Sequence, residues 1–246
     1  VHADRLRASE ATGELAVELA NKGLTPDQLL TNESIENALR ILLSIGGSTN
    51  AVIHLTAIAG RLGKKVSLET LNRLSDTTPM LVNLKPSGTH YMEHFFAAGG
   101  MGAVLRELKP LLHLNCLNIS GQTLGERLEG EEEYVDYEVI RPLNDPVEPY
   151  GGLVSLFGSL APQGAIIKRS AADSSLFERK GRAFVFHSLE NLSSSIDDPE
   201  LDVKSDDFLI LQNAGPRSGT GMPESGYLPI PAKLSKAGVK DMVRIS

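Results

Sequence analysis

Apolar residues in the first half of the chain recur with the spacing of a helix. Through residues 35–43 they fall at i, i+4, i+7 and i+8, which places them on one helical face. Gly46 and Gly47 interrupt this pattern, and a second apolar stripe runs through residues 52–62 to Gly63. A glycine at this position suits the left-handed backbone conformation that commonly ends an α-helix. The sequence therefore predicts a helix, a glycine turn and a second helix. The first of these helices is expected to start at Thr25, where a capping residue precedes a proline, and a further helix is expected over residues 4–21.

The pattern changes after residue 128. An acidic run occupies residues 129–133, and three prolines follow within residues 142–149. Beyond them, Gly, Ser, Asp and Pro separate short β-type runs at 153–157, 165–168, 183–187, 208–212 and 239–246, with helices expected at 189–196 and 232–237. We therefore predict an α/β protein with a helical first part, 1–128, and a β-rich second part, 129–246.

Composition disfavours several classes of protein. A net charge of −7 and scattered basic residues argue against nucleic acid as a partner. No apolar run reaches the roughly 18–20 residues that cross a bilayer, and the first residues lack the plan of a signal peptide, so we expect a cytoplasmic protein with no membrane partner. The single cysteine, Cys116, can form no internal disulfide and cannot alone supply the thiolates of an iron–sulfur cluster. It is expected to be a small buried residue.

One segment matches a metal-binding pattern. His90, Glu93 and His94 fit H-x-x-E-H, in which two histidines bind zinc beside a catalytic glutamate. The segment also fits an ordinary helix start, because residues 86–89 supply a turn and a capping residue and two phenylalanines follow. The sequence marks no third ligand. We expect the helix start and keep a zinc hydrolase as the alternative.

Two glycine-rich segments are candidate binding sites. Ser48, Thr49 and Asn50 begin the second predicted helix, where free N–H groups and the helix dipole can hold a carboxylate, although a plain helix cap explains the same residues. The loop after the run 208–212 can expose backbone N–H groups, and it carries one carboxylate, Glu224, directly after Pro223 in the sequence. An ordinary surface turn fits this loop as well.

Several stretches, in this order, resemble the family of dihydroxy-acid and sugar-acid dehydratases. They are residues 46–55 (GGSTNAVIHL), 85–88 (KPSG), 98–100 (AGG), 116–125 (CLNISGQTLG), 164–168 (GAIIK) and the loop 215–224. The resemblance spans nearly the whole chain and assigns His90 and His94 to an ordinary helix region. Residues 211–216 and 228–234 are most similar to the sugar-acid branch, whereas Ser218 and Thr220 depart from the glycine and proline that the family often has there.

The resemblance implies a hydro-lyase that dehydrates a sugar acid (an aldonate) to a 2-keto-3-deoxy acid. In this family a cysteine-held iron–sulfur cluster acts on the leaving hydroxyl, a serine is the base at C2, and Mg²⁺ holds the carboxylate end. Residues 222–224 match the family's magnesium motif, so Glu224 is the expected ligand. Substrate contacts are expected from Ser48, Thr49, Asn50 and Pro223.

The remaining parts of that active site are expected outside this chain. The cluster cysteines and the other magnesium ligands belong to a segment before Val1, and the catalytic serine belongs to the stretch after Ser246. The chain starts without methionine inside a predicted helix and stops on a strand-like run. We therefore expect an inactive piece of a longer protein that contains no catalytic residue of its own.

The resemblance also implies a fold and an assembly. Residues 1–128 would end an N-terminal α/β domain, and 129–246 would form most of a swivelling β/β/α domain, within a homodimer or homotetramer. Three alternatives stay open: a dihydroxy-acid dehydratase of branched-chain amino-acid synthesis, the zinc hydrolase, and a non-catalytic binding module. Metal analysis tests the second of these, and turnover of aldonates tests the third.

Overall fold

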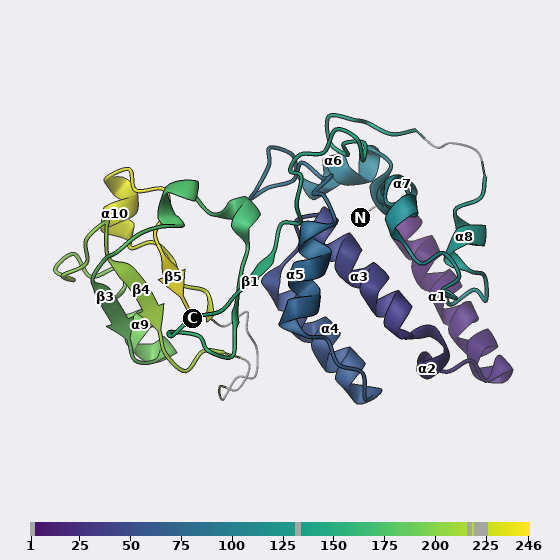
Figure 1. Ribbon diagram of the computed structural model, residues 1–246, viewed down its shortest axis with the longest axis horizontal. Helices are drawn as coiled ribbons and strands as arrows, with labels where there is room; N and C mark the ends of the chain where they lie inside the picture. The colour runs from purple at the N-terminus through teal and green to yellow at the C-terminus, as the bar shows by residue number, and fades with distance from the viewer. Residues whose placement is uncertain (1–2, 131–133, 216–217, 219–225) are drawn as a thin grey trace. The chain divides into compact units, whose positions relative to one another are not determined.

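The computed structural model describes residues 3–130, 134–215, 218 and 226–246 (Figure 1). The chain forms two compact units, one that runs to Gly47 and continues with Leu55–Ile167, and one made of Ser48–His54 and Lys168–Ser246. The chain combines helices with two small sheets, so the α/β class is confirmed. The domain boundary expected at residues 128–129 stays a prediction.

The first unit is largely helical. Its helices are α1 (Ala3–Lys22), α2 (Pro26–Leu29), α3 (Asn32–Ser44), α5 (Leu68–Asp76), α6 (Met92–Ala97), α7 (Gly100–Glu107) and α8 (Leu124–Arg127), with a 3-10 turn at Lys109–Leu111. Helix α4 (Thr49–Arg61) begins in the segment grouped with the second unit and continues in the first. None of these helices, nor any other in the described parts of the chain, combines the length and apolar character of a membrane span.

The helix expected from Thr25 onward ends after one turn. Leu30 leaves the helical conformation, with φ −90° and ψ 68°. The hydroxyl of Thr31 then accepts a hydrogen bond from the Ser34 N–H at 3.1 Å and starts α3. A second capping residue within the segment therefore divides one predicted helix into two.

Helix α3 forms the core of the first unit. The four apolar positions predicted to share one face are all buried: Ile35, Leu39, Leu42 and Leu43. Helix α5 lies beside it and buries Leu71 and Leu74 (Figure 1). Each such side chain contributes about 1.5–3 kcal/mol when it leaves water. The apolar stripe therefore fixes the face on which the rest of the unit packs.

A two-stranded antiparallel sheet completes this unit. Strands β1 (Val154–Leu156) and β2 (Ala165–Ile167) pair with Ser155 opposite Ile166. The side-chain amide of Asn72, on α5, accepts from the Ser155 N–H at 2.7 Å and donates to the Ser155 carbonyl at 3.0 Å. This amide bonds β1 as a neighbouring strand would, and it attaches the sheet to α5.

The second unit is built on a parallel sheet. Its strands are β3 (Ala183–Phe186), β4 (Phe208–Leu211) and β5 (Arg244–Ile245), in the order β3-β4-β5, with α9 (Leu189–Ser195) and α10 (Ala232–Lys236) between them and 3-10 turns at Arg169–Ala171 and Ser174–Leu176. The strand and helix positions expected from the sequence are confirmed. Only two residues of the run 239–246 are in a strand.

One buried carboxylate joins the amino ends of β3 and β4. The Arg182 guanidinium donates to both oxygens of Asp207, at 3.0 and 2.7 Å, and to Asp202 at 2.8 Å. Asp207 is only 3% exposed, yet the hydrogen bonds from Arg182 hold its pKa below the usual range despite burial. The two strands are therefore fixed side by side at this edge.

Gly151 provides a test of the packing against α3. A Cβ atom at this position would lie 2.9 Å from the Leu43 Cβ and 2.9 Å from the Ser75 Oγ, and both residues are fully buried. We predict that Gly151→Ala lowers the free energy of unfolding by about 1–3 kcal/mol, because a packed site must expand. Urea unfolding followed by circular dichroism measures this value.

Gly13→Ala is the matched control. Gly13 lies in the exposed helix α1, and nothing would lie within 4 Å of its added Cβ. This variant should keep or raise the free energy of unfolding, by up to about 1 kcal/mol. Equal unfolding midpoints for the two variants would contradict the close contact at Gly151.

Candidate functional site

The glycine turn after α3 has a defined hydrogen-bond pattern. The Gly46 N–H donates to the Leu43 carbonyl at 3.3 Å, and the Gly47 N–H donates to the Leu42 carbonyl at 2.9 Å. Gly46 has φ +58°, and a Cβ on Gly47 would lie 2.2 Å from the Leu42 Cδ1. These two bonds form a Schellman motif, which explains both glycines through the end of α3.

Ser48 caps the helix that follows. Its hydroxyl oxygen accepts from the Asn50 N–H at 3.2 Å, while its carbonyl accepts from the Ala51 N–H at 3.1 Å. Ser48 is exposed, and Thr49 and Asn50 are half-buried. The structure thus brings the three predicted residues together on the first turn of α4, beside its free N–H groups. Their contact with a substrate stays a prediction.

The predicted metal ligand, Glu224, and its neighbour Pro223 lie outside the described residues. Both ends of their loop are described. A Cβ on Gly226 would lie 3.2 Å from the Ala214 carbonyl oxygen and 3.0 Å from the Ser246 Oγ. Ala214 follows β4 and Ser246 follows β5, so the loop leaves from and returns to the carboxyl edge of the parallel sheet.

Polar residues at the same edge were not recognised from the sequence. His187 follows β3 and Gln212 follows β4, and the His187 Nδ1 lies 3.0 Å from the Gln212 Oε1. Asn213, with φ +59°, directs its side-chain amide to the His187 carbonyl at 3.5 Å. The signal available in the sequence was a polar residue at the end of each predicted run, His187 in 183–187 and Gln212 in 208–212.

The H-x-x-E-H segment starts a helix, but with a different cap from the one expected. Helix α6 begins at Met92, and the Nδ1 of His94 accepts from the Tyr91 N–H at 3.1 Å. The Thr89 N–H instead donates to the Asn83 side chain at 2.9 Å, so the expected cap within residues 86–89 is wrong. His90 precedes the helix, and its ring meets that of His94 edge to face at 5.4 Å. The two histidines therefore do not share a helical face.

Cys116 is only partly buried, in contrast to the expectation. The Asn37 side-chain amide donates to its Sγ at 3.6 Å and to the His113 carbonyl at 2.9 Å. Burial raises the pKa of the Cys116 thiol, so the neutral form is favoured over a metal-binding thiolate. Across the described parts of the chain, no three His, Cys, Asp or Glu side chains gather as a metal site would require.

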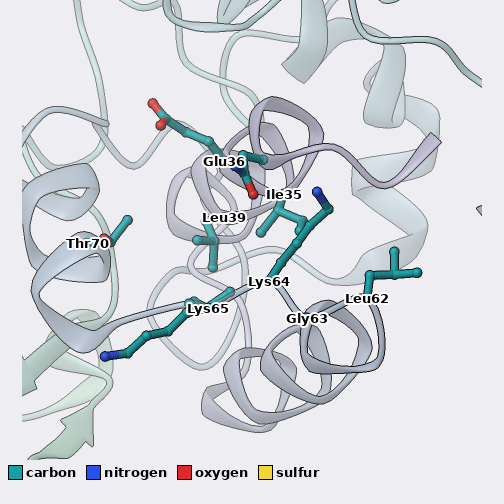
Figure 2. A pocket seen from close by; sticks show the side chains of 10 residues that line it. Ile35, Glu36, Leu39, Leu62, Gly63, Lys64, Lys65 and Thr70 are labelled. Carbon is teal, nitrogen blue, oxygen red and sulfur yellow. The ribbon is translucent and has the colours of Figure 1, made fainter. Parts of the chain in front are cut away.

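A cavity of about 500 Å³ lies elsewhere in the first unit (Figure 2). Ile35 and Leu39 form its apolar floor, and the Lys64 side chain extends over it. The carboxylate of Glu36 bonds Arg40 at 3.2 Å and Arg73 at 3.4 Å. Burial opposes ionisation of Glu36, but the two arginines together hold its pKa below the usual value. None of the predicted site residues lines this cavity.

Comparison with known proteins gives a consistent result over the whole chain. Residues 1–127 match the model for the N-terminal region of dihydroxy-acid/6-phosphogluconate dehydratases, and residues 138–246 match the model for the C-terminal region. L-Arabonate dehydratase of Azospirillum brasilense is 44% identical over 100% of this chain and 42% of its own length. The 6-deoxy-6-sulfo-D-gluconate dehydratase of Pseudomonas putida is 43% identical over 98% of the chain and 42% of its own length.

A relative from the other branch is similar as well. Dihydroxy-acid dehydratase of Caldicellulosiruptor bescii is 41% identical over 91% of this chain and 40% of its own length. The chain therefore spans less than half the length of these relatives. Because both family models match and together cover nearly all residues, the chain belongs to the dihydroxy-acid/6-phosphogluconate dehydratase family.

Proposed function

We propose that the whole protein is a hydro-lyase that converts a sugar acid to a 2-keto-3-deoxy acid. The observation that carries this proposal is the similarity, over nearly the whole chain, to dehydratases named for arabonate and sulfogluconate. The expected assembly is a cytoplasmic homodimer or homotetramer, as the family resemblance implies. A dihydroxy-acid dehydratase is the second candidate, because relatives with that name reach 41% identity.

The reaction removes two groups from neighbouring carbons. A 2,3-dihydroxy acid loses its C2 proton and its C3 hydroxyl, and the resulting enol becomes a keto acid. This requires a base at C2, an electrophile for the leaving hydroxyl, and a cation for the carboxylate end. As the family resemblance implies, we propose that the base and the electrophile come from parts of the protein outside this chain.

The described residues do not fit an iron–sulfur cluster. A cluster needs several thiolates. Cys116 is the only cysteine, its pKa is raised by burial, and its sulfur accepts a hydrogen bond from Asn37. We therefore assign no step of the reaction to a cluster held by this chain.

Glu224 fits a magnesium ligand by its chemistry. Magnesium prefers hard carboxylate oxygens, and Pro223 restricts the backbone directly before this carboxylate. The described ends of the loop, Ala214 and Gly226, lie at the carboxyl edge of a parallel sheet, where ligands of α/β proteins commonly bind. We propose Glu224 as one ligand of Mg²⁺ in the whole protein.

The first turn of α4 fits a carboxylate contact. Ser48 occupies one free N–H of the turn, and the dipole of this 13-residue helix favours a negative group at this end. We propose that Ser48, Thr49 and Asn50 contact the substrate, together with Pro223 on the loop.

The direct test is a turnover assay of the full-length protein. Five- and six-carbon aldonates and a branched 2,3-dihydroxy acid are compared by keto-acid formation. We expect kcat/KM for at least one aldonate to exceed that for the branched acid by at least about tenfold, the cost of one or two lost hydrogen bonds. The 246-residue chain alone should form no keto acid. A preference for the branched acid would favour the second candidate.

Glu224→Gln tests the metal ligand in the same protein. The change preserves the size of the side chain and removes its charge. Affinity for Mg²⁺ and turnover should therefore each fall by about 10- to 100-fold, while the midpoint of unfolding stays at the wild-type value. Glu200→Gln, at an exposed position in the same unit, is the control and should leave both unchanged. Wild-type magnesium dependence in Glu224→Gln would refute the assignment.

Two substitutions of Ser48 separate capping from substrate contact. Ser48→Ala should lower the free energy of unfolding by about 1 kcal/mol, because the cap is lost. Ser48→Asp restores a capping oxygen, so stability should return to that of the wild type. In the full-length protein the added carboxylate should raise KM for the aldonate by repulsion. An unchanged KM in Ser48→Asp would refute the substrate contact and show that Ser48 only caps α4.

A further inference from the structure

The carboxyl edge of the parallel sheet carries a set of exposed polar side chains. β3 ends on the buried Phe186 and β4 ends on the buried Leu211, which are paired in register. His187, Gln212 and Asn213 follow directly, and all three are exposed. Because the strands are parallel, residues 25 positions apart in the sequence meet at one edge.

His187 is held on several sides. Its backbone N–H donates to the Asn191 side chain at 3.1 Å, and its carbonyl accepts from Asn213 at 3.5 Å. Its ring Nδ1 lies 3.0 Å from the Gln212 Oε1. Since Asn213 is in the left-handed region, which asparagine tolerates, the backbone after β4 turns sharply at this point. An exposed histidine is thus given a fixed orientation.

The hydrogen bond to Gln212 sets the chemistry of the ring. The Oε1 of Gln212 accepts, so the neutral imidazole carries its proton on Nδ1 and its Nε2 is an acceptor. None of the described residues bonds this Nε2. A hydroxyl group is the natural donor to such an atom.

We propose that His187 binds a hydroxyl group of the sugar acid through Nε2 and contributes to substrate specificity. This inference rests on the function proposed above. A sugar acid carries hydroxyls beyond C3, whereas the branched dihydroxy acids of the related branch carry alkyl groups there. One oriented acceptor at the edge from which the Glu224 loop leaves would therefore favour the polyhydroxy substrate.

Two substitutions distinguish the two ring nitrogens. The amide nitrogen of asparagine can take the place of Nδ1, and the amide group of glutamine can reach the position of Nε2. In the full-length protein, His187→Asn should keep the bond to Gln212 and raise KM for the preferred aldonate about 3- to 10-fold, with kcat near wild type. His187→Gln should recover most of the wild-type KM.

His90→Asn makes the same substitution in the first unit and should leave KM and kcat unchanged. Thermal unfolding of all three variants shows whether each is folded. A wild-type KM in His187→Asn, or equal losses in both His187 variants, overturns the proposal. If the wild-type protein dehydrates no sugar acid, the proposed function fails and this inference fails with it. If the wild-type protein dehydrates a sugar acid and His187→Asn has the wild-type KM, only the inference fails.

Discussion

The carbonyl groups at the carboxyl end of α3 constrain the whole first unit. A helix leaves its last carbonyls without intrahelical partners, and buried ones must find donors elsewhere. Here the Leu42 carbonyl accepts from Gly47 at 2.9 Å, the Leu43 carbonyl from Gly152 at 3.1 Å, and the Ser44 carbonyl from Leu81 at 2.8 Å. The turn that follows α3 and two segments distant in the sequence, at Leu81 and Gly152, are thereby positioned from one helix end.

This constraint separates structural from functional residues within one motif. Gly46 and Gly47 are required by the turn itself, through a positive φ and a close approach to Leu42. Ser48 then caps α4, so its hydroxyl has a structural role whether or not a ligand binds. Only the half-buried Thr49 and Asn50 are without such a role in the described contacts of the turn. A family motif in this position therefore has a structural role first, and the substrate contact proposed for Ser48 would add to its capping role.

Local patterns predicted the elements better than they predicted the contacts. The spacing of residues 35–43 identified the buried face of α3, and the apolar runs identified β3 and β4, because both signals depend on a few neighbouring residues. The helix end at Leu30 and the cap by His94 depend on which nearby side chain bonds the backbone N–H groups at a helix start. The spacing of apolar residues carries no information about this choice. Contacts between distant residues, such as His187 with Gln212, require the strand order and were therefore missed. Glu224 lies outside the described residues, so its role rests on the motif.

The two edges of the parallel sheet differ in a way that bears on function. At the amino edge, Arg182 pairs with the buried Asp207, and a carboxylate with satisfied hydrogen bonds and a lowered pKa stabilises the strand starts but offers nothing to a ligand. At the carboxyl edge, polar side chains face solvent, and Gly226, at one end of the glycine-rich loop, lies close to Ala214 after β4 and to Ser246 after β5. Since α9 and α10 each return the chain to the amino edge, every strand leaves at the carboxyl edge, and the residues that follow successive strands lie there together. We therefore expect the substrate contacts made by the sheet to lie at its carboxyl edge.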